Sequence, residues 1–421
     1  MARIVLVGAG SAQFGLGTLA DVFRSQPLEG STVVLHDINP TALERVLEIG
    51  QAHVRAHNLP FTLEATTDRS VALTGADYII ISIEIGDRFK LWEQDRTIPQ
   101  QYGFRQVFGE NGGPGGLFHS LRIVPQILAI CGDVMRLCPD AWVLNFSNPM
   151  SRICTTVMTK YPDLHLVGLC HEIHSLARHL PPMLDRPLED LELVAGGLNH
   201  FSMLLKATYK DTGADAYPDI RRAVPAYFAD MPEHSLFMEL FKRYDLLPIT
   251  SDSHLGEYLQ WAHDVVDHQG ILNFYNRYKA SCMLHISQPP QSLDEVHEGE
   301  RVIPIVEALL TGEPSQEGAL NLPNKGLIDG LPSDIVVEVP GVVDGSGVHG
   351  TPLGRLPAGF LGLLQNQVAA HALTAEAVLT GSKKAIVQAL LADLNIDKVK
   401  PVEQMVDTLL TYQADYLGYI K

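Results

Sequence analysis

Two residues that commonly bind divalent metals lie thirty positions apart near the middle of the chain. Cys170 is followed by His171 and Glu172, and His200 ends the segment 197–200 (Gly-Leu-Asn-His). A thiolate and an imidazole can share a divalent metal ion and leave coordination positions open for a substrate. A lone cysteine is more often a small buried apolar residue, and a lone histidine is more often structural. The spacing therefore raises a metal site as a hypothesis without supplying a closed set of ligands.

Two further segments carry polar side chains in arrangements that are unusual for simple connections. Residues 110–116 (Glu-Asn-Gly-Gly-Pro-Gly-Gly) indicate a rigid polar loop, and residues 145–150 (Asn-Phe-Ser-Asn-Pro-Met) follow a predicted strand. Ligands of open α/β sheets bind beyond the carboxyl ends of the strands. The second segment is therefore expected at a ligand site.

A glycine-rich turn near the N-terminus predicts a dinucleotide site. The apolar run 3–7 ends at Gly8, and Gly10 and Gly15 follow it before a helical segment. Such a strand, turn and helix bring backbone N–H groups to a pyrophosphate. Asp37 ends the next predicted strand, about where an acid would bind the ribose 2′-hydroxyl and repel a 2′-phosphate. We therefore predict NAD as the cofactor in preference to NADP or FAD; the alternative is an ordinary β–α turn.

Apolar strands alternate with helical segments through the first part of the chain. This pattern implies an α/β fold, with a doubly wound, Rossmann-like parallel sheet covered on both faces. We predict an NAD-binding domain over 1–170 and an α+β substrate and metal domain with C-terminal helices over 171–421. The predicted strands are 3–7, 31–35, 78–83, 142–145, 167–169, 191–194, 202–206 and 335–339, and the predicted helices include 16–23, 41–57 and two or three over 357–415.

The composition narrows the class of protein. The chain has 421 residues and a formal net charge of −18, which argues against nucleic acid or an anionic membrane as a partner. Its five cysteines are an odd number without a CxxC pair, which fits reduced thiols better than a disulfide framework. The sequence shows neither a signal-peptide layout nor an apolar run of membrane-spanning length. We expect a soluble cytoplasmic protein.

Taken together, the motifs resemble family 4 of the glycoside hydrolases, which are NAD- and manganese-dependent glycosidases distantly related to lactate and malate dehydrogenases. The resemblance extends over nearly the whole chain. This family is an exception to glycoside hydrolysis by two carboxylates. The motifs that carry the resemblance, in chain order, are Gly8-Ala-Gly-Ser11, segments 110–116 and 145–150, Cys170-His-Glu-Ile173, segment 197–200, Val336-Val-Glu-Val-Pro340 and Leu356-Pro357.

The resemblance implies a redox-assisted elimination. NAD takes hydride from C3 of the sugar, a base removes the C2 proton, the leaving group departs from C1 with help from an acid, and NADH returns the hydride after water adds. The metal stabilises the enediolate as a Lewis acid. The implied site residues are Cys170 and His200 as metal ligands, Asn148 as a substrate contact near the metal, Glu110 and Asn111 over the sugar or the nicotinamide, and Gly8, Gly10, Ser11, Gly15 and Asp37 as cofactor-binding residues.

The proton-transferring groups stay open within this resemblance. The leaving-group acid is either His171 or Glu172. The family takes its C2 base, a tyrosine or an aspartate, from the second domain, and segment 251–258 resembles that region. Asp252 is the favoured base, with Tyr258 and His254 as alternatives. An aspartate at the start of a helical pattern is equally typical of a helix N-cap.

The tetrapeptide Cys-His-Glu-Ile resembles the Cys-His-Glu-Val pattern of the α-galacturonidase subgroup, with Ile173 as the only departure. The resemblance therefore implies a small unphosphorylated sugar substrate, an α-linked galacturonide, and a homodimer or homotetramer. A uronate needs a cation, ideally a bidentate arginine. Glu172 beside it would be unfavourable unless protonated or turned toward another group. The cations available in loops predicted near the site are Arg88, Lys90, Arg96, Arg105 and Arg277.

Other functions are compatible with parts of the pattern. Within the family, the alternatives are an α-glucosidase or α-galactosidase of neutral sugars and a glycosidase of another anionic sugar such as a glucuronide. A malate-type NAD-dependent 2-hydroxy-acid dehydrogenase would have a shorter chain and lack the Cys170 and His200 pair. A non-enzymatic NAD-sensing protein would need neither that pair nor the 110–116 segment.

Overall fold

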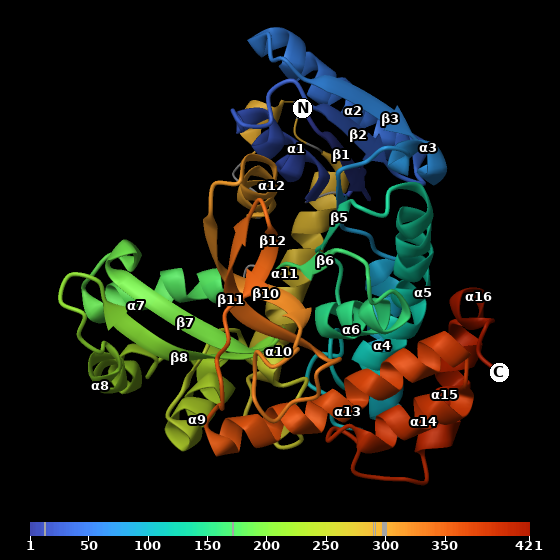
Figure 1. The fold of residues 1–421 in the computed structure, drawn as a ribbon. Coiled ribbons are helices and arrows are strands. Elements are labelled where there is room, and N and C mark those ends of the chain that lie inside the picture. The colour runs from blue at the N-terminus through green and yellow to red at the C-terminus, as the bar shows by residue number, and fades with distance from the viewer. Residues whose placement is uncertain (12–13, 171, 289, 291, 297–300) are drawn as a thin grey trace.

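A twelve-stranded sheet forms the centre of the structure, a computed structural model that describes residues 1–11, 14–170, 172–288, 290, 292–296 and 301–421. The strand order is β3-β2-β1-β4-β5-β6-β10-β11-β7-β8-β9, and β12 pairs with β11 outside this path (Figure 1). The strands are β1 (Arg3–Val7), β2 (Thr32–His36), β3 (Thr62–Thr66), β4 (Tyr78–Ile81), β5 (Trp142–Asn145), β6 (Leu166–Gly168), β7 (Leu191–Leu198), β8 (Phe201–Tyr209), β9 (Leu247–Pro248), β10 (Ser315–Pro323), β11 (Val336–Asp344) and β12 (Gly347–Gly350).

The first six strands pair in parallel in the order 3-2-1-4-5-6. This is the strand order of dinucleotide-binding Rossmann folds, in which a ligand lies across the point where the order reverses. The predicted fold class is therefore confirmed. Helices cover both faces of this part of the sheet: α1 (Phe14–Arg24), α2 (Pro40–His57) and α12 (Val302–Thr311) on one, and α3 (Arg69–Leu73), α5 (Gly113–Leu137) and α6 (Met150–Lys160) on the other.

Alternate residues of the parallel strands enter two different cores. Along β4, Ile79 and Ile81 pack with α5 and α6, while Tyr78 and Ile80 belong to the core beneath α1 and α2. All four side chains are buried, because successive residues of a strand point to opposite faces and both faces are covered. This explains why the inner strands β1, β4 and β5 are largely apolar runs, whereas the edge strand β3 is not.

The second half of the sheet is antiparallel. Strand β10 pairs antiparallel with both β6 and β11, and β7, β8 and β9 follow as an antiparallel group. A third core lies beneath these strands. The helices of this half are α7 (Leu176–Leu184), α8 (Tyr217–Tyr227), α9 (Ser235–Tyr244), α10 (Asp252–Leu255) and α11 (His268–Ser287).

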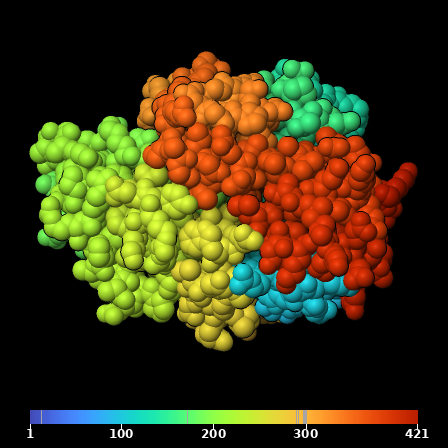
Figure 2. Space-filling model, turned by 90° about the horizontal axis from the view of Figure 1, so that it is seen from below, coloured from blue at the N-terminus to red at the C-terminus, as the bar shows by residue number. Residues whose placement is uncertain are grey.

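The C-terminal helices return to the N-terminal half of the molecule. Helix α13 (Ala358–Thr380) packs on α6, α14 (Lys383–Ala392) on α5, and α15 (Val402–Tyr412) on α4 (Arg88–Gln101), and α16 (Ala414–Leu417) follows. Seen from below, these helices (red) lie beside the segment that contains α4 (cyan) (Figure 2). The C-terminal chain therefore completes the core of the N-terminal half, although the sequence places it in the predicted second domain. The two-domain division stays a prediction.

The segment 110–116, predicted as a loop, differs in the structure. Its last four residues form the first turn of α5, and Pro114 occupies an initial position that tolerates a missing N–H. A Cβ at Gly116 would lie 2.2 Å from the carbonyl carbon of Asn111, so only glycine lets the helix start beneath that residue. Among the described residues, α5 is long and apolar enough to cross a membrane, but 67% of its most apolar window is buried within the fold.

Candidate active site

The carboxyl ends of β5 and β6 place two of the predicted site residues at one edge of the sheet. Asn145 and Gly168 are paired across these strands, so Asn148 and Cys170 follow their strands at neighbouring positions. The Oδ1 atom of Asn148 is buried and accepts no hydrogen bond from the described residues. A buried carbonyl oxygen without a donor is costly unless a ligand supplies one.

Cys170, Glu172 and His200 form a cluster whose ligand atoms all lie within 4.8 Å of one another. The Sγ atom of Cys170 is 3.5 Å from Nε2 of His200, and that nitrogen is 3.7 Å from Oε1 of Glu172. Burial, together with the charges of Glu172 and Glu338, raises the pKa of the Cys170 thiol well above its ordinary value. A metal ion bound here would therefore displace the thiol proton.

His200 reaches the cluster from a tight turn between β7 and β8. Leu198 pairs with Phe201, so Asn199 and His200 alone make the turn, and His200 takes the left-handed conformation at φ +62°. A non-glycine residue in this conformation is uncommon and often marks a functional constraint. The buried carboxylate of Glu338 on β11 accepts hydrogen bonds from the Asn199 side chain (2.8 Å) and from Ser202 (2.8 Å). It thereby fixes the turn.

His254 lies between the metal cluster and the 110–111 segment. Its ring stacks on that of His200, with centroids 4.4 Å apart, and its Nε2 is 3.8 Å from Oε1 of Glu172. Its Nδ1 is 3.5 Å from Glu257 and 3.4 Å from the Asn111 side chain. Burial alone would lower the pKa of His254, but the hydrogen bond with Glu257 and the nearby carboxylates raise it to about 9. His254 therefore connects the two parts of the site.

Glu110 and Asn111 are held by a buried carboxylate from a distant segment. Glu257 accepts hydrogen bonds from the backbone N–H groups of both residues and from the Asn111 side chain (3.1 Å). Arg152, itself 1% exposed, donates to the carbonyl oxygen of Asn111 at 3.1 Å. The Oδ1 atom of Asn111 is buried without a hydrogen bond from the described residues. Like Asn148, it offers a buried acceptor to a ligand.

Arg88 is the predicted cation that the structure brings to this site. Its guanidinium donates to Glu110 (2.6 Å) and to Tyr278 of α11 (2.8 Å), and lies 3.6 Å from Glu84. Arg96 and Arg105 pair instead with Glu93 and Asp264. A guanidinium already bound to carboxylates has less capacity for a substrate carboxylate.

The glycine-rich turn joins β1 to α1 as predicted. Gly15 lies where a Cβ would come within 1.9 Å of the carbonyl oxygen of Ala9, so it permits the close contact of helix and strand. Ser11 caps the start of α1 by accepting a hydrogen bond from Phe14. Asp37, at the end of β2, accepts from the Gly10 N–H at 2.8 Å. The turn and the acid are thus adjacent, as a dinucleotide site requires.

Asp252, the favoured candidate for the C2 base, already accepts two backbone hydrogen bonds. Its two carboxylate oxygens accept hydrogen bonds from the backbone N–H groups of Leu236 and Phe237, each at 2.8 Å, so it caps the preceding helix α9. It is 1% exposed, and burial raises its pKa to about 7. Tyr258 is buried as well and donates weakly to the carbonyl oxygen of Asn199 at 3.4 Å. His171 lies outside the described residues.

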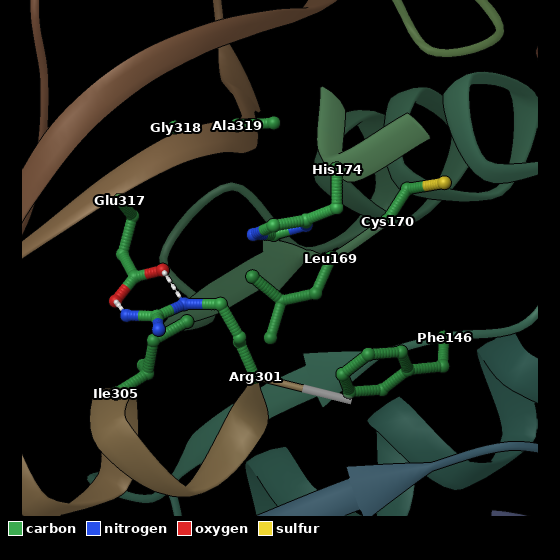
Figure 3. A pocket seen from close by; sticks show the side chains of 9 residues that line it. All are labelled: Phe146, Leu169, Cys170, His174, Arg301, Ile305, Glu317, Gly318 and Ala319. Atoms are coloured by element: carbon green, nitrogen blue, oxygen red, sulfur yellow. Dashed lines mark hydrogen bonds and ion pairs between the residues drawn. The ribbon is translucent and has the colours of Figure 1, made fainter. Parts of the chain in front are cut away.

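A small hollow lies behind Cys170, on the side away from its sulfur atom (Figure 3). Its volume is about 20 Å³. Arg301 and Glu317 form an ion pair across it at 3.4 Å, and the His174 ring points toward that pair. The guanidinium of Arg301, on this side of Cys170, is therefore already paired with a carboxylate, as that of Arg88 is. The lining residues are Phe146, Leu169, Cys170, His174, Arg301, Ile305, Glu317, Gly318 and Ala319.

Sequence reasoning missed at least four supporting residues, one of which is Arg152. Glu257 and Glu338 lie in segments 251–258 and 336–340, which were singled out without a role for the acids, and Thr250 donates to Glu172 at 2.5 Å. A glutamate within a buried apolar strand, such as Glu338, is the one signal that could have indicated a partner. Charged side chains are almost never fully buried unless paired.

Comparison with known proteins agrees with this geometry. The sequence matches the family 4 glycosyl hydrolase model over residues 3–186 and the model of that family's C-terminal domain over residues 195–396. An alpha-glucosidase of Erwinia rhapontici is 48% identical, over 100% of this chain and 99% of that protein. An alpha-galacturonidase of Bacillus subtilis (strain 168) is 28% identical, over 97% and 96% respectively. The crystal structure of a 6-phospho-alpha-glucosidase from gut microorganisms, in complex with NAD and Mn²⁺, superposes with a TM-score of 0.81 at 22% identity over 98% of each chain.

Proposed function

Since the chain belongs to family 4 of the glycosyl hydrolases, a family of glycosidases, we propose that it hydrolyses α-glucosides of unphosphorylated, neutral glucose with NAD and Mn²⁺ as cofactors. The observation that carries the proposal is the cluster of Cys170, Glu172 and His200 at the edge of a dinucleotide-binding sheet. The alpha-glucosidase at 48% identity supports this sugar in preference to the galacturonide.

The residues present fit a divalent metal ion. Cys170 and His200 offer a sulfur and a nitrogen atom 3.5 Å apart, and Glu172 adds a carboxylate oxygen. Thiolate, imidazole and carboxylate are ligands of divalent transition metals. The buried Oδ1 of Asn148 lies at the same edge of the sheet and would accept a hydrogen bond from a sugar hydroxyl.

The N-terminal turn fits NAD. The Gly8 to Ser11 turn leads to the N-terminus of α1, and the N-terminus of a helix stabilises a pyrophosphate. Asp37 is placed to accept a hydrogen bond from a ribose hydroxyl in exchange for that of Gly10. The same carboxylate would repel the 2′-phosphate of NADP.

Residues of the chain would orient the sugar and transfer protons, while the two cofactors supply the redox and Lewis-acid chemistry. When bound, NAD accepts and returns a hydride at C3, and the metal ion polarises the oxygen there. Asn111 and Asn148 would orient the sugar through their buried carbonyl oxygens. We assign proton transfer at C2 to His254, because its ring borders both Glu172 of the metal cluster and Asn111. The positive charge of a bound metal ion would lower the pKa of His254 and favour the neutral ring that can accept a proton. Glu172 lies within the cluster and stays a candidate for the leaving-group acid.

The charges of the site favour a neutral sugar. Glu110 and Glu257 lie near the metal cluster without being counted among its ligands, and their carboxylates would repel a uronate carboxylate close to them. The guanidinium groups of Arg88 and Arg301 are already paired with glutamates. A carboxylate substrate would have to break one of these pairs, whereas a glucose hydroxyl would not.

The test is hydrolysis of 4-nitrophenyl α-glucoside and 4-nitrophenyl α-galacturonide, each with and without NAD and Mn²⁺. We expect cleavage of the glucoside, dependent on both cofactors, without accumulation of NADH. Preferential cleavage of the galacturonide would overturn the choice of sugar and leave the reaction in place. Cleavage that does not need NAD would overturn the reaction itself.

The assignment of His254 has a separate test. In deuterated water, the C2 position of the product sugar should take up deuterium during turnover. His254→Asn should slow this uptake strongly, whereas Asp252→Asn should leave it nearly unchanged in folded protein. The opposite ranking of the two variants would return the role to Asp252.

A further inference from the structure

Two histidines and an aspartate form a second cluster on the outer surface of the NAD-binding half. His53 and His57 are four residues apart on α2, so their rings lie on the same face of the helix, with centroids 4.3 Å apart. Asp294 comes from the short helical turn Leu293–Glu295 that leads toward α12. The three ligand atoms lie within 4.8 Å of one another.

The distances in this cluster match the spacing of ligands around one ion. Oδ1 of Asp294 is 3.4 Å from Nε2 of His57 and 3.6 Å from Nδ1 of His53. Atoms bound at about 2.0–2.1 Å to a tetrahedral zinc ion are separated by about 3.3–3.4 Å, so two edges of the tetrahedron are nearly formed. Nδ1 of His53 is also buried and makes no hydrogen bond to the described residues, although it faces this carboxylate.

Neighbouring residues hold the Asp294 and His53 side chains in place. Ser292 donates a hydrogen bond to the second oxygen of Asp294 at 3.0 Å, which turns Oδ1 toward the histidines. The ring of Phe23 stacks on His53 at an interplanar angle of 7°. Leu293, 1% exposed, anchors the turn in the core beneath α1 and α2. Metal ligands are typically oriented by such surrounding contacts.

We propose that His53, His57 and Asp294 bind a divalent transition-metal ion, with zinc, nickel or copper favoured over manganese. Two imidazoles and one carboxylate favour these ions, whose affinity for nitrogen ligands exceeds that of Mn²⁺. The exposure of His57 and Asp294 gives an ion and a completing water molecule access. This site is separate from the Cys170 cluster and does not rest on the proposed reaction.

An ion bound here would tie two distant parts of the chain together. The segment 292–296 is otherwise held on α1 and α2 by Leu293 and by a hydrogen bond from Arg24 to the carbonyl oxygen of Val296 (2.8 Å). Helix α12, which follows, contributes Ile305 to the lining of the hollow behind Cys170. The ion would therefore stabilise the segment 292–296 against local detachment from α2.

The experiment measures Zn²⁺ binding by calorimetry to the full-length, NAD-loaded chain carrying Cys170→Ser, which weakens the other metal site. We expect a saturable site in this parent and a loss of affinity of at least about 100-fold when His57→Gln or Asp294→Asn is added. Co²⁺ should give the visible absorption of a tetrahedral complex in the parent and lose it in both variants.

His349→Gln is the matched control, since His349 faces Asp344 at 3.6 Å without a second histidine. It should leave both readouts unchanged. Zn²⁺ binding that persists at the parent's affinity in His57→Gln and Asp294→Asn would overturn the proposal. So would the absence of binding in the parent, or loss of binding in His349→Gln.

Discussion

Glu257 holds Asn111 at two points, accepting its backbone N–H on one carboxylate oxygen (2.8 Å) and its side-chain amide on the other (3.1 Å). The residues are 146 positions apart, so the contact exists only in the folded chain. It aims the buried Oδ1 of Asn111 toward the site and leaves that atom free of a donor from the described residues. Glu257 is therefore a positioning residue for the sugar.

Glu257→Gln should lower kcat by about 10- to 100-fold, because an amide keeps the size of the side chain but loses the charge and one of the two acceptors. Binding of Mn²⁺ and of NAD should change little, since neither predicted ligand set includes Glu257. Steady-state kinetics and titration of both cofactors would show this separation. Glu64→Gln, at an exposed salt bridge with Arg3, is the control. An equal loss of metal affinity would contradict the positioning role.

Cys170→Ser should weaken Mn²⁺ binding and lower kcat by roughly 10³-fold, since Lewis-acid stabilisation is worth several kcal/mol. His200→Gln should act in the same direction, because its Nε2 is the partner atom 3.5 Å away. Metal titration followed by hydrolysis assays checks both. Cys138→Ser removes another buried thiol and should retain Mn²⁺ affinity. If Cys170→Ser behaves like Cys138→Ser, Cys170 is only a core residue.

Asp37→Asn should raise the Kd for NAD by about 10- to 100-fold, because a hydrogen bond to a charged group is worth about 1.5–3 kcal/mol. It should also narrow the preference for NAD over NADP, since the repulsion of a 2′-phosphate disappears. Fluorescence titration with the two reduced cofactors measures both effects. Asp68→Asn, at the cap of α3, is the control. An unchanged ratio of the two affinities would exclude Asp37 from the ribose site.

Asp252 should make the stability of the protein depend on pH. Burial raises its folded-state pKa to about 7, above the ordinary value of 3.8, so the folded state holds a proton that the unfolded state has lost. The free energy of unfolding that Asp252 contributes is therefore fully present below about pH 4. It declines as the pH rises to about 7, by up to roughly 4 kcal/mol. Urea unfolding of wild type and Asp252→Asn at several pH values isolates this difference. A difference that does not change with pH would contradict the raised pKa.

Much of the parallel sheet could be predicted from the sequence, because strands buried on both faces are continuous apolar runs. Strand β10 could not be predicted, since polar residues, glycine and proline interrupt the apolar pattern of residues 315–323 (Ser-Gln-Glu-Gly-Ala-Leu-Asn-Leu-Pro). The start of α5 was hidden for a related reason. Its glycines and Pro114 indicate a loop by composition, and only the packing against Asn111 explains them.

The residues of the site could be predicted where short sequence motifs encode their chemistry. They could not be predicted where their role depends on tertiary contacts. Cys170 and His200 could be named from their motifs, and the structure brings them together. Glu257 could not, because its partners lie in another part of the chain. Asp252 shows the limit of local reasoning: an N-cap role was considered for the helix that follows it, yet it caps α9, which precedes it.

The antiparallel strand β10 has a mechanical consequence. It pairs with β6 through Asn321 and Gly168 on one side and with β11 on the other, and β11 pairs with β7 through Glu338 and Gly197, so Cys170 and His200 extend from strands of one sheet. A hinge between the two halves would have to break one of these pairings. We therefore expect the sugar to enter through movements of side chains and short loops. The metal residues would also be lost together, in one cooperative step, when the sheet melts.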